Sequence, residues 1–539
     1  MRRKWCRPTT CSGPKKEHEE EAPLRTQLDP AVYKSLERNA CLKIDLQVLP
    51  LCLLLYLLSF LDRTNVSQSM MDRGETRPDG SIKDPGIMTS LDMTPHQFAT
   101  ALSVLYPTYM VFEIPANLMI KRVGARIWMP FLVMAWGLVE TLQGLVSSKT
   151  GLYICRVFLG LTEAGIMPGI TVYLTFFYRP NELQYRQAFF FTGTSLSCAF
   201  SPLLAVAIRK MDGIAGQHGW QWVFYLEGIF TVLVGFISYF LLSNEPSDCA
   251  LLSPLEKRVA VERLQESSDR YTNHDELATK LKQTEPDVSE DEAPRYVASS
   301  WSREVWRAFT DIRCVLISVL GFCISMPIFS LAYFMPSIVK GINEDYTTVE
   351  SMLMSCPPFA VSFAFSLIIA VISDRTRQRY FCMVACYLLC IVGLAVALGC
   401  NDSMTRYGGI IMAASGGYAG PPCLLAWIAN NTAGHYKTAT ALAMIIILDN
   451  CSGLASSWLF NTKTEAPRFT RGIATNLAMS VLGLILATVL ELLIMYERRQ
   501  RARGRRDEAV LALYKRTRWT EDQLREYMGD DHPEFHLEL

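Results

Sequence analysis

Charged residues are scarce over most of this sequence, because they are concentrated in three segments. Its 539 residues include 52 Lys and Arg and 52 Asp and Glu, so the formal net charge is zero, and half of the residues are hydrophobic. Residues 1–45, 244–311 and 497–539 carry 61 of these 104 charged residues. The remaining 383 residues carry 43, which is too few to cover the surface of a soluble protein. This distribution argues against a set of ordinary globular domains.

Signatures of enzymes and metal sites are also scarce. The chain has seven His, which leaves few general bases, and none of its 16 Cys form a Cys-x-x-Cys pair. It has no Gly-x-x-x-x-Gly-Lys loop and no nucleophile elbow. Cys382, Cys386 and Cys390 recur every four residues, which favours a packing stripe on one helix face over a ligand cluster. We therefore predict that the chain is not an enzyme and has no metal or cofactor.

Two apolar blocks remain, and both consist of segments long enough to cross a bilayer. About 20 mostly apolar residues in a helix span the hydrocarbon layer and satisfy their own backbone hydrogen bonds. The first block contains such segments at 46–66, 96–120, 127–147, 152–177, 187–208 and 221–243. The second contains them at 312–338, 351–373, 380–399, 407–430, 438–460 and 474–496. We predict an all-α membrane protein with twelve transmembrane helices in two six-helix bundles, residues 46–243 and 312–496.

The distribution of Lys and Arg predicts the orientation of these spans. The first 45 residues are polar and show no secretory signal, and Lys and Arg are more frequent in the short loops on the side of the termini. The N-terminal tail 1–45, the linker 244–311 and the C-terminal tail 497–539 are then expected in the cytoplasm. Asn401-Asp-Ser403 lies in a predicted outer loop and fits an N-glycosylation acceptor.

Four ionisable residues inside the first block are candidates for function. Asp62 and Arg63 lie near the end of the first span, and Arg156 and Glu163 lie in the fourth. A charged side chain in a span costs several kcal/mol unless it is paired or hydrated. Arg156 and Glu163 share one helix face about 10 Å apart, so each needs another partner. An acid in such surroundings can exchange protons, and Arg can hold a carboxylate. The alternative is that Asp62 and Arg63 are interfacial and that the other two contact neighbouring helices.

Other polar and aromatic residues in the spans are weaker candidates. For each of them taken alone, contact between helices or core packing is favoured over a place in a transport path. The residues considered as lining a cavity are Tyr106, Asn117, Trp427 and Asn430.

Basic loops follow the second span of each predicted bundle. The first contains Lys121 and Arg122, and the second contains Asp374 and Arg375. Internal repeats with a site between the two halves are typical of secondary transporters. The second loop resembles the Gly-x-x-x-Asp-Arg-x-Gly-Arg pattern of the major facilitator superfamily, although it lacks the glycine. The first loop has Lys121 where that pattern has Asp. The resemblance implies that these two loops gate the transport path.

Several spaced motifs between about residues 45 and 500 make the resemblance more specific. They are Glu113-Ile-Pro-Ala-Asn117, Arg156-x-x-x-Gly160-x-x-Glu163, Met211-Asp-Gly213 and Gly219-Trp-Gln-Trp222. Together they resemble the anion:cation symporter family in its fungal branch, which is similar to the allantoate, nicotinate, pantothenate and biotin permeases. A departure is His435-Tyr-Lys437, because the branch usually has a basic pair after the preceding glycine.

The resemblance implies proton-coupled symport of a small carboxylate, vitamin or ureide by alternating access at the fungal plasma membrane. Asp62 and Glu163 would couple protons, and Arg63 and Arg156 would bind the anion. The expected partners are an anionic small molecule, protons and the lipid bilayer, with no nucleic acid and a monomeric chain. Two alternatives stay open at this point. The chain could be an exporter or metabolite carrier of a biosynthetic pathway, or a nutrient receptor that does not transport.

Overall fold

The computed structural model describes most of the chain. The described residues are 24–72, 84–270, 301–343, 345–376, 378–433, 435–460, 467–503, 510, 513–514 and 528–532. These residues form helices and no strand. Part of the predicted linker, including its acidic stretch 284–294, lies outside the described residues.

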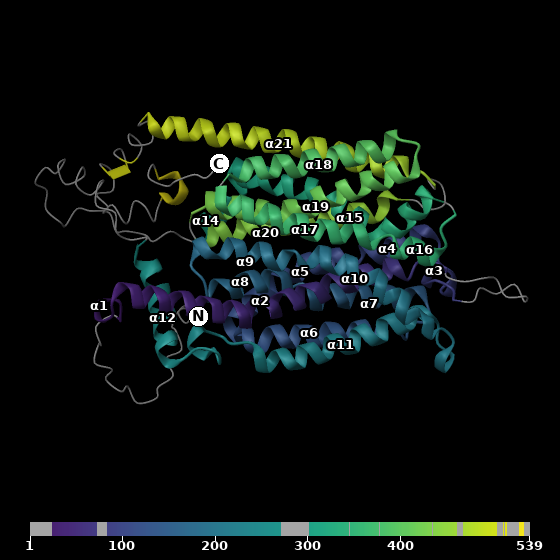
Figure 1. Ribbon diagram of the computed structural model, residues 1–539, viewed down its shortest axis with the longest axis horizontal. Coiled ribbons are helices and arrows are strands. Elements are labelled where there is room, and N and C mark those ends of the chain that lie inside the picture. Colours follow the sequence, from purple (N-terminus) through teal and green to yellow (C-terminus); the bar gives the residue numbers. More distant parts are fainter. Residues whose placement is uncertain are drawn as a thin grey trace, which may run out of the picture.

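Long helices lie side by side in two halves, and the described ends of the chain gather at one end of the molecule (Figure 1). The N-terminal half contains α2 (Pro30–Gln68), α4 (Pro95–Ser103), α5 (Leu105–Val123), α6 (Ala125–Gln143), α7 (Lys149–Glu163), α8 (Ile166–Thr175), α9 (Pro180–Phe191), α10 (Gly193–Ile208) and α11 (Gly219–Leu241). The C-terminal half contains α15 (Ile312–Ile342), α16 (Thr348–Leu353), α17 (Cys356–Thr376), α18 (Arg379–Gly399), α19 (Ser403–Asn431), α20 (His435–Leu459) and α21 (Thr470–Ala502). Shorter helices α1 (Leu24–Gln27), α12 (Pro254–Arg270) and α14 (Trp301–Thr310) lie at the end with the termini, and α3 (Ile87–Ser90) lies at the opposite end.

The prediction of an all-α membrane fold is confirmed. Ten helical segments among the described residues are long and apolar enough to cross a membrane. The two other predicted spans, 96–120 and 407–430, also form helices, namely α4 with α5 and α19. The first is interrupted near Val104 and carries Glu113, and the second is rich in glycine and contains Pro421, so both are less apolar than the rest.

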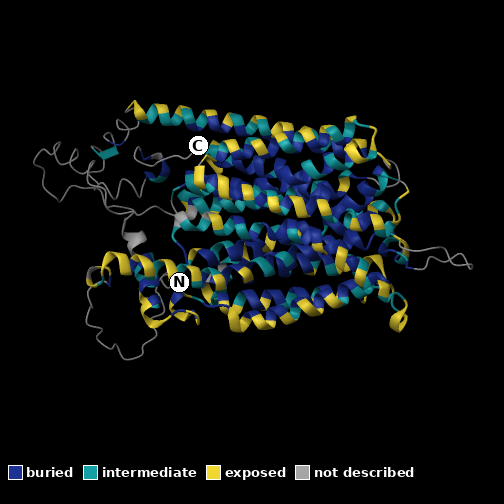
Figure 2. Cartoon of the chain, viewed as in Figure 1, coloured by how far each residue is buried: buried dark blue, intermediate teal, exposed yellow. Residues whose placement is uncertain are grey.

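The outer faces of the helices are apolar. On α11, Phe230, Leu233, Phe236 and Phe240 are each at least half exposed, and exposed residues run along the sides of the long helices (Figure 2). Polar side chains such as Glu227 on the same helix are buried instead. This arrangement suits a lipid environment, in which the helices turn apolar side chains outward.

Glycines allow close helix pairs in both halves. Helices α6 and α11 meet at Gly137 and Gly228, where a Cβ on Gly137 would lie 2.9 Å from the Gly228 carbonyl oxygen. Helices α18 and α19 meet at Gly393 and Gly409, where a Cβ on Gly393 would lie 2.5 Å from the Gly409 carbonyl oxygen. Small residues at such contacts let helix backbones approach within a membrane. The halves therefore share a similar packing device.

A cap of charged residues covers the N-terminal half at the end with the termini. The buried Arg263 of α12 donates to the Phe177 carbonyl and lies 3.2 Å from Glu182. Lys43 of α2 pairs with Glu256 of α12 at 2.8 Å. This pair, formed through a hydrogen bond from Lys43, holds the pKa of Glu256 below its usual range. The long extension of α2 beyond the predicted span at 46–66 is thus packed against α12.

A second ionic network, here called the C-terminal clasp, lies at the same end of the C-terminal half. It consists of Asp311, Arg313, Lys437 and Asp530. Lys437 Nζ lies 2.7 Å from Asp311 and 2.8 Å from Asp530, whose residue is 1% exposed. Arg501 of α21 donates to the Asp530 carbonyl at 2.7 Å. The clasp therefore joins a short tail segment to the beginnings of α15 and α20 and to the end of α21.

Candidate functional site

The four ionisable residues predicted from the sequence lie together inside the N-terminal half. Asp62 and Arg63 are on α2, and Arg156 and Glu163 are on α7. Their exposed fractions are 0%, 8%, 2% and 1%. We call these four residues the charged cluster. All four are buried within the protein rather than placed at an interface with headgroups.

Arg63 and Glu163 form the ion pair at the centre of the cluster. Arg63 Nε lies 2.7 Å from Glu163 Oε1, and the same oxygen accepts a hydrogen bond from the Ser59 hydroxyl. The guanidinium also lies over the ring of Tyr109, 4.8 Å from its centroid. Cation–π contact and the ion pair both favour a positive charge at this position. The pair links α2 to α7 across the interior.

Asp62 faces a different neighbour from the adjacent Arg63. The indole N–H of Trp136, on α6, donates to one Asp62 carboxylate oxygen. The other oxygen is buried and has no hydrogen-bond partner among the described residues. Because consecutive side chains on a helix point in different directions, one turn of α2 brings Asp62 towards α6 and Arg63 towards Glu163.

Arg156 is buried without a full set of hydrogen bonds. Its Nε and Nη2 atoms have no hydrogen-bond partner among the described residues. The charges that act on it are those of Glu140, Asp62 and Glu163, and Glu140 acts most strongly of the three. A guanidinium carries five N–H donors in a fixed fork, so two free nitrogens can still receive a carboxylate. Two nitrogens of the Arg156 guanidinium therefore keep unused donors beside the cluster.

Further polar residues surround the cluster, and two of them, Glu140 and Gln143, were not singled out from the sequence. Glu140 and Gln143 of α6 are fully buried. Glu227 of α11 accepts a hydrogen bond from Asn65 of α2, which also accepts one from Ser201 of α10 at 3.3 Å. The signal for Glu140 was present, because it is an acid inside the predicted span 127–147.

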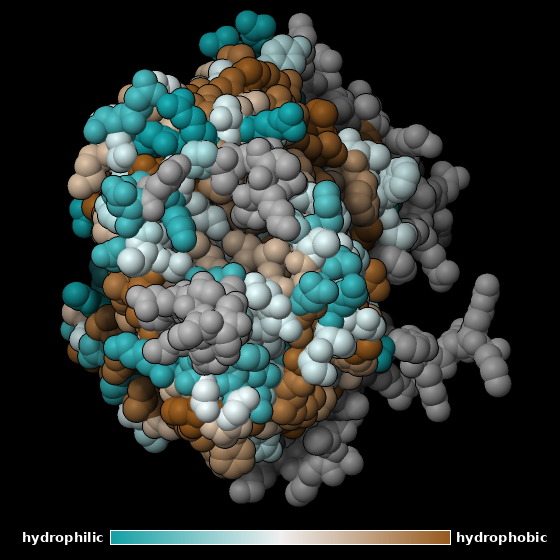
Figure 3. All heavy atoms as spheres, turned by 90° about the vertical axis from the view of Figure 1, so that its right-hand side faces the viewer, coloured by the Kyte–Doolittle hydropathy of each residue, from teal (hydrophilic) through white to brown (hydrophobic). Residues whose placement is uncertain are grey.

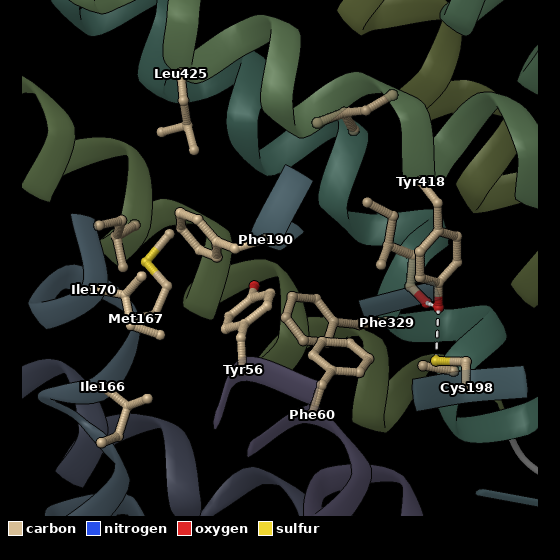
Figure 4. Packing of buried hydrophobic residues seen from close by; sticks show 14 of the residues in the cluster. Tyr56, Phe60, Ile166, Met167, Ile170, Phe190, Cys198, Phe329, Tyr418 and Leu425 are labelled. Carbon is tan, nitrogen blue, oxygen red and sulfur yellow. Dashed lines mark hydrogen bonds between the residues drawn. The ribbon is translucent and has the colours of Figure 1, made fainter. Parts of the chain in front are cut away.

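An aromatic layer closes the site on the side of the C-terminal half. Phe60 of α2 stacks on Phe329 of α15 with ring centroids 6.0 Å apart, as Figure 4 shows. Tyr106 of α5 contacts Phe329 edge-on at 5.8 Å, and its hydroxyl is hydrogen-bonded to that of Tyr333. Cys198 and Tyr418 form a further contact between the halves at 3.3 Å. Of the predicted cavity-lining residues, Tyr106 thus lies where the two halves meet.

The other three cavity-lining candidates lie elsewhere. Asn117 is half-buried on α5, and its side-chain oxygen has no hydrogen-bond partner among the described residues. Trp427 is fully buried within the C-terminal half, with its ring centroid 6.5 Å from that of Tyr380 on α18. Asn430 is half-buried near the end of α19. Trp427 and Asn430 both belong to α19 of the C-terminal half, whereas the charged cluster is on α2 and α7.

The predicted gating loops lie at the end of the molecule with the termini. Lys121 and Arg122 belong to the last turn of α5; Arg122 is exposed, and the Lys121 side chain lies outside the described residues. Asp374 pairs with Arg379 at 3.0 Å rather than with the adjacent Arg375, which is exposed. Asp374 belongs to the end of α17 rather than to a loop, and the sequence pattern did not identify its partner.

The opposite end of the molecule carries a groove between the halves. It has a volume of about 820 Å³ and is lined by residues that include Asp72 and Met93 of the N-terminal half and Ser337, Lys340 and Phe469 of the C-terminal half. Figure 3 looks onto this end, where hydrophilic and hydrophobic residues are mixed.

Asn401 is exposed at the same end of the molecule. It lies between α18 and α19, and its side-chain oxygen accepts a hydrogen bond from Arg468 at 2.9 Å. Its glycosylation stays a prediction.

The molecule consists of two halves of apolar-faced helices, with a cluster of buried charges inside the N-terminal half. The chain matches the model of the Major Facilitator Superfamily over residues 52–457 and belongs to that superfamily. It is therefore a multi-pass membrane transporter and not an enzyme, as the sequence analysis predicted.

The relatives of the chain are fungal transporters. It is 29% identical to the MFS-type transporter cnsO of Penicillium expansum, over 94% of this chain and 92% of the relative. It is 26% identical to the high-affinity nicotinic acid transporter of Saccharomyces cerevisiae, over 85% of this chain and 78% of the relative. These similarities agree with the predicted resemblance to fungal permeases.

Solved structures agree on the fold. A bacterial homologue of the human lysosomal transporter Spinster, in an inward-facing and unoccupied conformation, matches with a TM-score of 0.55 at 15% identity. The match covers 83% of this chain and 96% of that protein.

Proposed function

We propose that the chain is a secondary active transporter that couples protons to the symport of a small organic anion. The observation that carries this proposal is the buried ion pair between Arg63 and Glu163, at 2.7 Å. In this pair, a proton competes with Arg63 for the Glu163 carboxylate, and a substrate anion competes with Glu163 for the Arg63 guanidinium. Such competition is a simple way to make substrate binding depend on a proton.

The coupling follows from charge balance inside the bundle. While Glu163 is ionised, it holds the Arg63 guanidinium and neutralises it. When Glu163 takes up a proton, Arg63 remains charged and buried without its partner, which is costly. A substrate carboxylate then restores the pair. Proton and anion therefore bind together more favourably than either does alone, which is the requirement of a symporter.

Arg156 and Asp62 extend this site. Arg156 has two buried nitrogens without hydrogen-bond partners among the described residues, so it can fork onto the same carboxylate or a second acceptor. Asp62 is a second buried acid, and it acts electrostatically on Arg156. On this proposal the substrate is an anion bound between two arginines, and Asp62 and Glu163 carry the protons.

One relative supports the proposed class of anion. One of them is named a high-affinity nicotinic acid transporter, and nicotinic acid is a small aromatic carboxylate. The aromatic layer of Phe60, Tyr106 and Phe329 beside the cluster suits a flat ring. We therefore propose a carboxylate of vitamin size, with ureides as a second class to be tested.

The proposal includes an orientation in the plasma membrane. Both termini would face the cytoplasm, so that the groove containing Lys340 opens to the outside. The loops with Lys121 and Asp374 would then gate the cytoplasmic side, and the chain would act as a monomer in which the two halves rock around the cluster.

Uptake into proteoliposomes tests the proposal. The probes are radiolabelled nicotinate and a panel of other carboxylates and ureides, supplied with and without an acidic outside. Glu163→Gln should abolish the stimulation of uptake by acid while keeping counterflow between equal pH values, because Gln cannot ionise but can still hydrogen-bond. Glu491→Gln, which changes a buried acid of α21 outside the site, should leave both unchanged.

The outcome can also contradict the proposal. If Glu163→Gln loses counterflow as completely as it loses acid-driven uptake, Glu163 has no specific coupling role. If preloaded wild-type vesicles release a probe but never accumulate one, the direction is export.

A further inference from the structure

Helix α6 carries a buried polar stripe that the proposed mechanism has not used. Trp136, Glu140 and Gln143 lie on one face because they are spaced by four and three residues. All three are fully buried. Trp136 is in contact with the charged cluster through its hydrogen bond to Asp62. Glu140 and Gln143 continue the same face towards the end of the helix that lies opposite the termini.

Glu140 and Gln143 are buried without hydrogen-bond partners. Both carboxylate oxygens of Glu140 and both amide atoms of Gln143 lack a partner among the described residues. An ionisable group in this situation costs several kcal/mol unless it is hydrated or exchanges a proton. A role in packing alone would be better served by an apolar side chain. The stripe is therefore a candidate for function.

Charged groups surround Glu140 on three neighbouring helices. They are Asp62 on α2, Arg156 and Glu163 on α7, and Glu227 on α11. The Cys155 thiol of α7 also interacts electrostatically with Glu140. Asp62 is the charge that acts on Glu140 most strongly, and Glu140 is the charge that acts on Arg156 most strongly. Glu140 thus belongs to the electrostatic network of the cluster while lying nearer the membrane surface.

The polar stripe runs inward along α6. At 1.5 Å per residue, Glu140 lies about 5 Å from the end of α6, and Trp136, which is hydrogen-bonded to Asp62, lies about 11 Å from that end. This end of α6 lies opposite the termini (Figure 1). Gln143 is the last residue of α6. A polar series thus leads from this end of the N-terminal half to the buried ion pair.

We propose that Gln143 and Glu140 form the proton access route to Asp62 and Glu163, separate from the path of the substrate between the two halves. This inference rests on the proposed function, because it requires protons to reach the charged cluster. In the transfer step, the Glu140 carboxylic acid loses its O–H proton and becomes a carboxylate. The Asp62 carboxylate gains that proton and becomes the acid, so charge and atoms balance.

The separation of the two paths has a physical advantage. The groove between the halves opens and closes as the halves rock, whereas α6, α2 and α7 belong to one half. A route inside that half can load protons without waiting for the groove. Gln143 supplies both a donor and an acceptor at the outer end of the route, and Glu140 holds the proton at the next step.

Charge movement after a pH jump tests the route without a substrate. The full chain is reconstituted in vesicles of one orientation on a solid-supported membrane, and the probe is the proton itself. Acidifying the side opposite the termini should produce a transient current in the wild type. In Glu140→Gln the current should be slower by at least about tenfold, because a positioned proton-transfer group is lost. Glu140→Asp should restore much of the rate.

Further variants separate the route from a structural role. Gln143→Leu should slow the current about threefold, the effect of losing one hydrogen-bonding link, without removing an acid. Glu491→Gln is the matched control, and it should match the wild type. Gel filtration and acid-independent counterflow show whether each variant is folded, and Gln143→Leu keeps the test informative if Glu140→Gln does not fold.

Two outcomes would overturn the inference, and they differ in whether the proposed symport also fails. If the wild type shows a current but both Glu140→Gln and Gln143→Leu match its rate, the route is wrong while the proposed symport stands. If the wild type shows no proton-dependent current and no acid-driven uptake, the proposed function fails and the route fails with it.

Discussion

The two halves of this transporter pack their helices similarly but differ in what they bury. Both contain glycine-mediated helix pairs, at Gly137 and Gly393. The N-terminal half buries Asp62, Arg63, Glu113, Glu140, Arg156, Glu163 and Glu227 among its membrane-spanning helices. In the C-terminal half, buried cations such as Arg379, Arg406 and Lys437 lie near the helix ends, and the middle is rich in Ser, Cys and aromatic side chains.

On the proposed function, this difference indicates that the two halves have different roles in transport. Charges deep inside the N-terminal half cost too much to be kept for packing alone, so the proton and anion chemistry is assigned to that half. The C-terminal half contributes Phe329 and Tyr333 as the facing wall and Asp449 of α20, a charge that acts on Arg63. Its ionic network, the C-terminal clasp, is placed where it stabilises helix ends.

A matched pair of arginines gives the sharpest test of this division, with the largest expected effect. Arg63 and Arg406 are both 8% exposed, but Arg406 donates to the Ala397 carbonyl, outside the charged cluster. Arg63→Gln should reduce nicotinate or panel uptake by about a hundredfold or more, since truncating one partner of a buried charge pair costs 2–5 kcal/mol. Arg406→Gln should lower thermal stability and leave uptake per folded molecule near the wild-type rate. An equal loss of uptake per folded molecule in both variants would contradict the proposed difference between the two halves.

The clasp should matter for stability and not for coupling. Burial raises the pKa of Asp311, but Arg313 and Lys437 outweigh it and lower the pKa to about 2. Asp311→Asn should destabilise the protein by about 3 kcal/mol, since it breaks a buried ion pair. Because the pKa is lower in the folded state, this contribution is present above pH 3.8, the usual value, and is lost as the pH falls towards 2.

Thermal unfolding in detergent measures this effect. The difference in stability between wild type and Asp311→Asn should be constant above about pH 5 and shrink below pH 3.8. The pH dependence of uptake should not change in this variant. If the variant has normal stability but an altered pH dependence of uptake, the clasp takes part in proton coupling and is not purely structural.

A smaller effect is expected from the indole that holds Asp62. Trp136→Phe keeps an aromatic ring, although a smaller one, and removes the N–H donor to the Asp62 carboxylate. The loss of one hydrogen bond to a charged group, worth about 1.5–3 kcal/mol at most, should shift the pH for half-maximal uptake by no more than about two units. The substrate concentration for half-maximal uptake should stay the same. A change confined to that concentration would place Trp136 in the substrate site instead.

Sequence patterns predicted the residues of the site better than their partners. Arg156 and Glu163, seven residues apart, were expected to need separate partners, and Glu163 is indeed paired with Arg63. Glu140 was missed although it lies in a predicted span, because a single acid near a helix end resembles an interfacial residue. Trp427 was considered for the cavity, but it packs inside the C-terminal half beside Tyr380.

The sequence alone determined the class of protein, because hydrophobic length and the cost of buried charge are local properties of a chain. They predicted the spans, the two halves and the residues that need an explanation, from Asp62 to Glu163. The tertiary structure decided which charges meet. The pairing of Arg63 with Glu163, of Asp374 with Arg379 and of Lys437 with Asp530 depends on which helix faces and tail segments come together. Those faces are set by long-range packing, which no local pattern encodes.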